Sequence, residues 1–185
     1  MRILTEARKA EPVIRWANWL SSFSGARLAE ITEADTRDIE DIDGVPVFHI
    51  RLDYRGIHQN VKNEGSLRRF PIHSAVIREG FLDYVRSLPP GPLFPTVRMN
   101  RDGKRSPEAG DIIMPWLRSI GITDPRKVFH SHRHTFKSLS RGRIEEEIHD
   151  YITGHGNGAV GRDYGLYPIP MLAEVIERIP DPTAA

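Results

Sequence analysis

Residues 12–31, PVIRWANWLSSFSGARLAEI, predict two successive helices near the start of the chain. Proline is favoured at the first position of a helix, and apolar residues then follow at spacings of three and four: Val13, Trp16, Leu20 and Phe23. This spacing places them on one face, so we expect an amphipathic helix that begins at Pro12. Ser24 and Gly25 interrupt the pattern, and ARLAEI begins a second short helix.

Two β-strands are expected after this helical pair. VFHIRLDY (residues 47–54) nearly alternates apolar and polar side chains, RRFPIHS (68–74) follows, and the residues 63–66 between them favour a turn. Helical periodicity then returns over residues 75–88 (with Ser74 as the expected N-cap), 106–122, 130–142, 143–154 and 170–179. The chain is therefore expected to be mainly α with a small antiparallel β-sheet (α+β), in a single domain over residues 1–185.

Composition narrows the class of protein. With 185 residues and 39% hydrophobic content, the chain can bury one substantial core. It has no cysteine, which excludes disulfides, thiolate metal sites and a cysteine nucleophile. The first residues, MRILTEARKAE, contain acidic side chains where a signal peptide would have an apolar run, and the apolar stretches of the chain are short. We expect a soluble, cytoplasmic protein that does not interact with membranes.

Charge is distributed unevenly along the chain. The net charge is only +1, which by itself disfavours a dedicated nucleic-acid binder. Residues 97–143, however, contain eleven Lys/Arg against four Asp/Glu, whereas residues 28–43 contain seven acids and one arginine. Such a chain can present a basic face to phosphates, although ordinary solvated faces would give the same counts.

Three alternating histidines, His130, His132 and His134, suggest a metal site at first. On a helix, residues two apart point to different faces, and Arg133 in their midst would repel a cation. His130 and Arg133, at i and i+3, are better suited to bind one anion together, because a guanidinium binds phosphate through two parallel hydrogen bonds. A metal-dependent phosphoesterase remains the less favoured alternative.

Three further segments, taken with this pair, resemble the tyrosine recombinases of the phage-integrase family. SGARLAEI (24–31) resembles the first family box, with Arg27 as a phosphate-binding arginine and Glu30 at the acidic position. FHSHRHTF (129–136) resembles the second box, with His130 and Arg133 as its catalytic pair and His134 in a supporting role. His132 stands where the family usually has leucine, and its side chain either lies near the site or affects the local packing. TGHGNGAVGRDYG (153–165) resembles the third.

The third segment supplies the nucleophile that the resemblance implies. His155 matches the family histidine, and Tyr164 lies nine residues later at the usual spacing for the nucleophilic tyrosine. Tyr167, three residues further on, is the rival. VKNEGSLRRFPI (61–72) resembles the β-hairpin that carries the family's catalytic lysine, which implies Lys62. The resemblance extends over nearly the whole chain, with the elements in the family's order.

The resemblance implies a function as well as a fold. The expected activity is site-specific DNA recombination (integration) through a 3′-phosphotyrosyl intermediate, without a metal or other cofactor. Expected partners are double-stranded DNA and further copies of the chain, as a tetramer in synapsis, in a bacterial or phage-encoded protein at the nucleoid. The family's N-terminal core-binding domain is expected to be absent, since the first box starts at Ser24. The alternative is a catalytically inactive DNA-binding remnant of an integrase.

The last predicted helix, PMLAEVIERI, has one apolar stripe: Met171, Leu172, Val175, Ile176 and Ile179. Two interpretations stay open. The stripe packs on its own domain, or it docks on a neighbouring protomer, as the segment after the tyrosine commonly does in the family.

Overall fold

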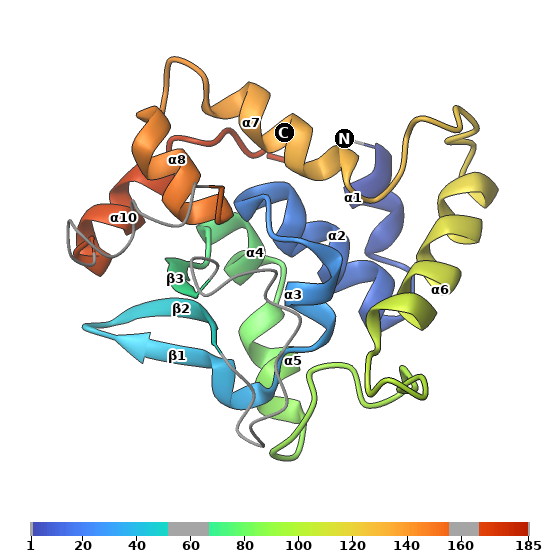
Figure 1. Cartoon of the computed structure of the whole chain (residues 1–185). Helices are drawn as coiled ribbons and strands as arrows, with labels where there is room; N and C mark the ends of the chain where they lie inside the picture. Colours follow the sequence, from blue (N-terminus) through green and yellow to red (C-terminus); the bar gives the residue numbers. More distant parts are fainter. Residues whose placement is uncertain (1, 52–66, 156–166, 185) are drawn as a thin grey trace.

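The computed structural model describes residues 2–51, 67–155 and 167–184, and this part is mainly helical with one three-stranded antiparallel sheet (Figure 1). The α+β class predicted from the sequence is confirmed. The helices described are α1 (Arg2–Ala7), α2 (Pro12–Ser24), α3 (Leu28–Thr32), α4 (Ser74–Arg78), α5 (Phe81–Ser87), α6 (Ser106–Ser119), α7 (Ser131–Ser140), α8 (Glu146–Thr153) and α10 (Ile169–Ile176), with a 3₁₀ turn, η1, at Thr36–Asp38. No helix among these residues is long and apolar enough to cross a membrane.

Helix α2 lies at the centre of the core, and its predicted apolar face is buried there. The four apolar residues of its stripe are each at most 3% exposed, and Trp16 packs edge-on against Phe81 of α5 at a centroid distance of 5.3 Å. The helix ends at Gly25, whose φ is 66° and whose N–H donates to the carbonyl of Ser21. A Cβ at Gly25 would lie 3.0 Å from Thr153 and 3.1 Å from Phe136. Glycine therefore lets the ends of α2 and α8 and the middle of α7 meet closely.

The sheet consists of β1 (Ile39–Ile42), β2 (Val45–Ile50) and β3 (Arg68–Pro71), in that order. Phe48 and Phe70 are opposite each other and stack at 5.3 Å in the core. Strand β1 was not predicted, because its IEDI sequence lies in the acidic segment. Asp43 and Gly44, with φ of 56° and 80°, form the two-residue connection to β2, and an Asp-Gly pair is a strong hairpin signal.

Two details of the predicted helix over residues 75–88 are wrong. It is divided into α4 and α5, because Gly80 has φ of 95° and leaves the helical region between them. The N-cap is His73, not Ser74: the His73 Nδ1 accepts the N–H of Ala75 at 2.9 Å. Ser74 is instead the first residue of α4, where its N–H and hydroxyl both donate to Glu177.

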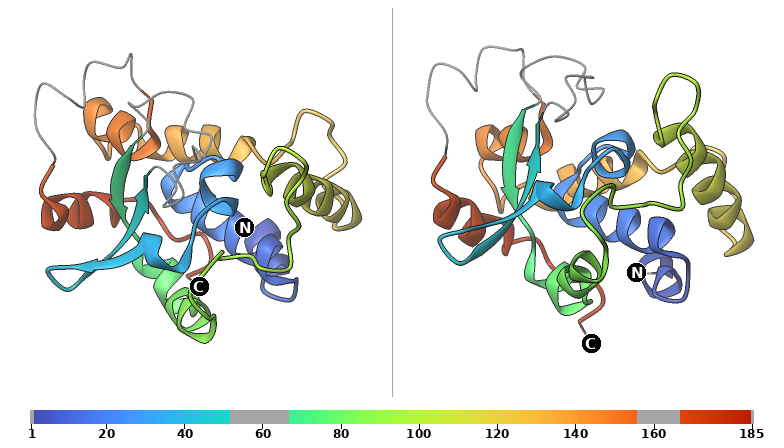
Figure 2. Two further views of the ribbon diagram at one scale, coloured as in Figure 1. Left: turned by 60° about the horizontal axis from the view of Figure 1, so that its bottom comes forward. Right: turned by 90° about the horizontal axis from the view of Figure 1, so that it is seen from below.

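The elements surround α2 and the sheet. Helices α8 and α10 lie along β3, and α6 lies at the opposite end of the molecule, against α2 and α3 (Figure 2). Helix α7 packs along α2. Strand β3, α3 and α7 therefore all approach the C-terminal end of α8, where Arg27, Arg133 and His155 gather among the predicted site residues that the structure describes.

Candidate functional site

The C-terminal end of α8 binds three arginines from three other parts of the chain. The last carbonyls of a helix have no partner within the helix and carry the negative end of its dipole, so they attract cationic donors. Here each of three consecutive carbonyls accepts from one arginine: Ile152 from Arg68 Nε at 2.7 Å, Thr153 from Arg133 Nη1 at 2.5 Å, and Gly154 from Arg27 Nη2 at 3.3 Å. The predicted pair Arg27 and Arg133 is thus brought together, with Arg68 as a third member.

Gly154 makes this convergence possible. It terminates α8 with φ of 63°, while the next N–H, of His155, donates to the carbonyl of Asp150 at 2.9 Å. A Cβ at Gly154 would lie only 2.6 Å from Arg68 Nη1. A side chain at this position would displace the guanidinium of Arg68, so the helix end and β3 approach as closely as glycine allows.

Glu30 is the carboxylate of the cluster. It forms a bidentate pair with Arg68, at 3.1 Å and 2.9 Å, and accepts from Arg27 through both its Nη1, at 2.6 Å, and its backbone N–H, at 2.8 Å. Burial by itself would raise the pKa of Glu30, but the charge and hydrogen bonds of Arg68, aided by Arg27, lower that pKa to about 2. Glu30 is therefore ionised and orients both arginines.

Arg133 is buried, and no carboxylate of the described residues pairs with it. It is 3% exposed, and besides the Thr153 carbonyl it donates to the Gly25 carbonyl at 2.8 Å and to His155 Nδ1 at 2.7 Å. Among the described residues it forms no ion pair. Burial, followed by the charges of Arg27 and Arg68, lowers its pKa to about 10. A guanidinium has five N–H groups, and the bonds of Arg133 to the described residues use three of them, which leaves two N–H groups without a partner in this part of the chain.

The contact with Arg133 determines the protonation of His155. Arginine has only donors, so Nδ1 of His155 must be the acceptor and its Nε2 carries the hydrogen. Burial and the charge of Arg133 lower the pKa of His155 to about 4. At neutral pH this imidazole is uncharged, and it presents an Nε2–H donor beside Arg133.

His130 and His134 lie at the start of α7, on its exposed side. Their rings meet edge to face at a centroid distance of 5.2 Å. Burial lowers the pKa of His130, and the charges of His134, Arg133 and Arg27 lower it further, so His130 lies within the electrostatic reach of the arginine cluster.

His132 points away from these two histidines. Its ring is buried between α7 and α2, where Nδ1 lies 2.9 Å from Ser22 Oγ and Nε2 lies 2.8 Å from Asn18 Oδ1. Of the two places that the sequence allowed for His132, the structure shows the second: the side chain is part of the packing between α7 and α2. The three alternating histidines do not converge, and among the described residues no group of three His, Asp or Glu side chains could hold a metal ion.

Two predicted catalytic residues, Lys62 and Tyr164, lie outside the described residues. The rival tyrosine, Tyr167, is described and packs edge-on against Tyr151 at 5.1 Å. Its pKa is raised to about 12 by burial, by a hydrogen bond with Glu147 and by nearby negative charge. A tyrosine in this environment is a poorer nucleophile than a free phenol.

Arg68 was missed from the sequence, although a signal existed. In strand RRFP, residues 68 and 70 share one face, and Phe70 is plainly a core residue. An arginine on the same face as a core phenylalanine must be buried, and a buried arginine needs a partner. That reasoning identifies Arg68 as part of a polar network.

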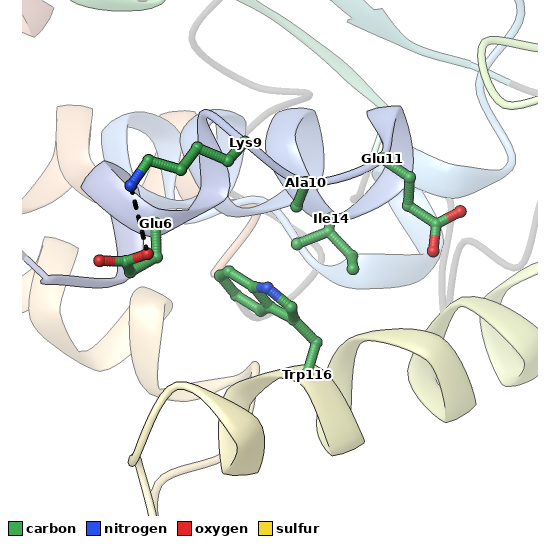
Figure 3. A pocket seen from close by; sticks show the side chains of 6 residues that line it. All are labelled: Glu6, Lys9, Ala10, Glu11, Ile14 and Trp116. Atoms are coloured by element: carbon green, nitrogen blue, oxygen red, sulfur yellow. Dashed lines mark ion pairs between the residues drawn. The ribbon is translucent and has the colours of Figure 1, made fainter.

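A separate pocket lies between the α1–α2 corner and α6. It has a volume of about 350 Å³ and is lined by Glu6, Lys9, Ala10, Glu11, Ile14 and Trp116. Figure 3 shows Trp116 pointing from α6 toward Ile14 and Ala10, with the charged side chains around the rim. This pocket shares no residue with the arginine cluster and holds no comparable set of donors.

Comparison of the chain with protein-family models, with curated proteins and with solved structures gave no match.

The side chains of the arginine cluster indicate which kind of ligand it can bind. The cluster holds three guanidinium groups and one buried carboxylate, Glu30, which pairs with Arg27 and Arg68, while Arg133 donates to carbonyls and a neutral imidazole. The charge of Asp150 also reaches Arg133 and His155, but three arginines still outnumber Glu30 and Asp150. Such a cluster keeps excess positive charge and fits an oxyanion of the phosphate type.

Proposed function

We propose that the chain is the catalytic part of a tyrosine recombinase, with the catalytic-domain fold of that family, and that it cleaves and rejoins DNA strands through Tyr164. The observation that carries the proposal is Arg133: a buried guanidinium, 3% exposed, that has no carboxylate partner among the described residues and lies beside Arg27 and His155. A buried charge without a counter-ion is costly. A DNA phosphate would supply the missing negative charge.

In this mechanism the cluster stabilises the pentacoordinate phosphorus of the transition state. Arg27 and Arg133 donate to the non-bridging oxygens, and His155 adds its Nε2–H, so that fixed donors oppose the charge that develops in the transition state. His130 forms a hydrogen bond with the same phosphate and helps to accept the proton that the phenol of Tyr164 releases. Fixed guanidinium charge takes the role that a metal ion has in many nucleases.

The cleavage and rejoining steps need no external energy source, because each bond that breaks is replaced by a bond of similar energy. Tyr164 Oη attacks the phosphorus, a bond forms between them, and the bond to the 5′-oxygen breaks. Lys62 protonates that oxygen, which leaves as a 5′-hydroxyl. The 3′-phosphotyrosyl link retains the phosphodiester energy, so the 5′-hydroxyl of a partner strand can reverse the reaction and join a new strand. Synapsis of two sites would need several copies of the chain, in the family as a tetramer on DNA.

The environment of Tyr167 supports the choice of Tyr164. An attacking phenol needs positive neighbours that lower its pKa, whereas Tyr167 lies beside Glu147 and has a pKa of about 12. Tyr164 also has the spacing from His155 that the resemblance requires.

The test uses a pool of nicked duplexes with randomised sequence, on which cleavage releases a short fragment and traps the enzyme. We expect a covalent protein–DNA adduct that withstands detergent and forms equally well with excess chelator. Binding without any adduct would favour the inactive DNA-binding remnant. Cleavage that a chelator abolishes, with no adduct, would favour the metal-dependent phosphoesterase.

A further inference from the structure

Arg68 has no role in the proposed chemistry, yet it touches both elements that carry the proposed phosphate donors. Its side chain is 2% exposed on β3. On one side it forms the bidentate pair with Glu30 of α3; on the other its Nε donates to the carbonyl of Ile152 in the last turn of α8. One planar group thus spans two elements.

The contact with α3 extends to Arg27. Glu30 uses the same two oxygens to bind Arg68 and to bind Arg27, through Nη1 at 2.6 Å and the backbone N–H at 2.8 Å. Because both carboxylate oxygens are held by the fork of Arg68, their direction toward Arg27 is fixed.

The contact with α8 extends to Arg133 and His155. Arg68 holds Ile152, the next carbonyl belongs to Thr153 and binds Arg133, and His155 follows two residues later. The space at Gly154 is closed so tightly by Arg68 that a Cβ there would lie 2.6 Å from Nη1. A shift of Arg68 would therefore move the end of α8 relative to α3.

We propose that Arg68 is a positioning residue that holds α3 and the C-terminal end of α8 in register, so that Arg27, Arg133 and His155 converge on one oxyanion that Arg68 itself does not contact. The identity of that oxyanion as a DNA phosphate rests on the proposed function. Small displacements of such donors are costly, because catalysis and anion binding depend on their geometry.

The test is the substitution Arg68→Lys, which keeps the positive charge beside Glu30 and removes the planar fork. Inorganic phosphate is the probe: its affinity is measured by calorimetry, at a temperature where thermal melting shows each protein to be folded. We expect affinity to fall about tenfold or more in Arg68→Lys. The matched control is Arg69→Lys, the next residue, whose side chain is 38% exposed and pairs with Glu40 at 3.5 Å; it should leave phosphate affinity unchanged.

A double replacement separates positioning from mere neutralisation of Glu30. Arg68→Met with Glu30→Met removes the buried pair together, and apolar replacements of buried pairs are often neutral for stability. We expect this protein to fold and to bind phosphate poorly. Wild-type phosphate affinity in a folded Arg68→Lys protein, or in the double variant, would overturn the inference, as would absence of phosphate binding by the wild type.

Adduct formation is scored separately on the nicked duplexes. At saturating DNA, Arg68→Lys should lower the rate of adduct formation about tenfold or more while changing DNA affinity little, since most DNA contacts lie elsewhere. If the wild type binds phosphate but forms no adduct, the proposed function fails; the effect of Arg68→Lys on phosphate affinity still decides the inference.

Discussion

The arginines of the cluster differ in what holds them. Arg68 is neutralised by a buried carboxylate, Arg27 shares that carboxylate and is a third exposed, and Arg133 is held by carbonyls and a neutral imidazole. Carbonyl groups satisfy hydrogen bonds without cancelling formal charge. A bound anion would consequently stabilise the charge of Arg133 more than the charge of Arg27 or Arg68.

This difference predicts how two substitutions act. Arg133→Ala and Arg27→Ala should each raise the barrier to DNA cleavage by roughly 3 kcal/mol or more, comparable to the loss of an oxyanion-hole donor. Arg27→Ala should melt close to the wild type, because Arg68 still pairs with Glu30. The measurement is the rate of adduct formation, with Arg126→Ala, an 89% exposed arginine, as control. Full activity in Arg133→Ala would refute the mechanism.

His132 gives a prediction about stability alone. In His132→Leu, the residue usual in the resembling family, Asn18 Oδ1 loses its imidazole partner in the core. A buried group left unsatisfied costs about 1–3 kcal/mol, so urea denaturation should show a loss of that order. Phosphate affinity should not change. A variant as stable as the wild type would mean that the contacts of His132 with Asn18 and Ser22 make no net contribution to the free energy of unfolding.

At the scale of elements, α10 packs on its own chain in this structure. Leu172, Val175, Ile176 and Ile179 of the predicted stripe are at most 3% exposed, against β2 and β3, while Met171 is 37% exposed. Packing within the chain, the first of the two interpretations, is what the structure shows. His73 Nε2, 3.0 Å from the carbonyl of Ile179, fixes the end of the segment.

Truncation and point substitution test this packing. Deletion of everything after Pro168 should lower thermal stability markedly, and Leu172→Ala should cost about 2–5 kcal/mol as a large-to-small core replacement. Met171→Ala is the control and should change stability by less than about 0.5 kcal/mol. If Leu172→Ala melted like Met171→Ala, α10 would not belong to the core, and docking on a neighbouring protomer would become the better interpretation.

Periodicity predicted the helices well where one apolar face dominates, as in α2 and α6. It failed where backbone conformation decides: Gly80 divides the predicted helix 75–88, and Asp43-Gly44 creates the β1–β2 hairpin inside an acidic segment. Arg27 and Arg133 could be proposed from local motifs. Arg68 could not be assigned to them by spacing, because only the tertiary meeting of β3, α3 and α8 brings it there.

At the scale of the whole molecule, the histidines predict loss of stability in acid. Burial lowers the pKa of His132 from 6.5 to about 4, and the pKa values of His73 and His149 are lowered for the same leading reason. These groups stay neutral in the folded chain while the unfolded chain binds protons below about pH 6.5. The contribution of these histidines to the free energy of unfolding is therefore complete above about pH 6.5 and is lost as the pH falls toward 4.

Urea denaturation at several pH values measures this effect. The free energy of unfolding should fall by roughly 3 kcal/mol between pH 7 and pH 4, and Glu30, with its pKa of about 2, should add a further loss below about pH 4.5. His132→Leu should show a shallower dependence above pH 4. Stability that is constant or rising toward acid would contradict the buried, neutral state of these histidines.

The proposed function requires Tyr164 to form a covalent bond to a DNA phosphate held by the arginine cluster. Adduct formation on nicked duplexes by the wild type, Tyr164→Phe and Tyr167→Phe tests it most directly, with DNA binding measured in parallel. We predict that Tyr164→Phe binds DNA and forms no adduct, while Tyr167→Phe keeps the adduct, because Tyr167 lies against Glu147 with a raised pKa. An adduct that persists in Tyr164→Phe and disappears in Tyr167→Phe would contradict the account.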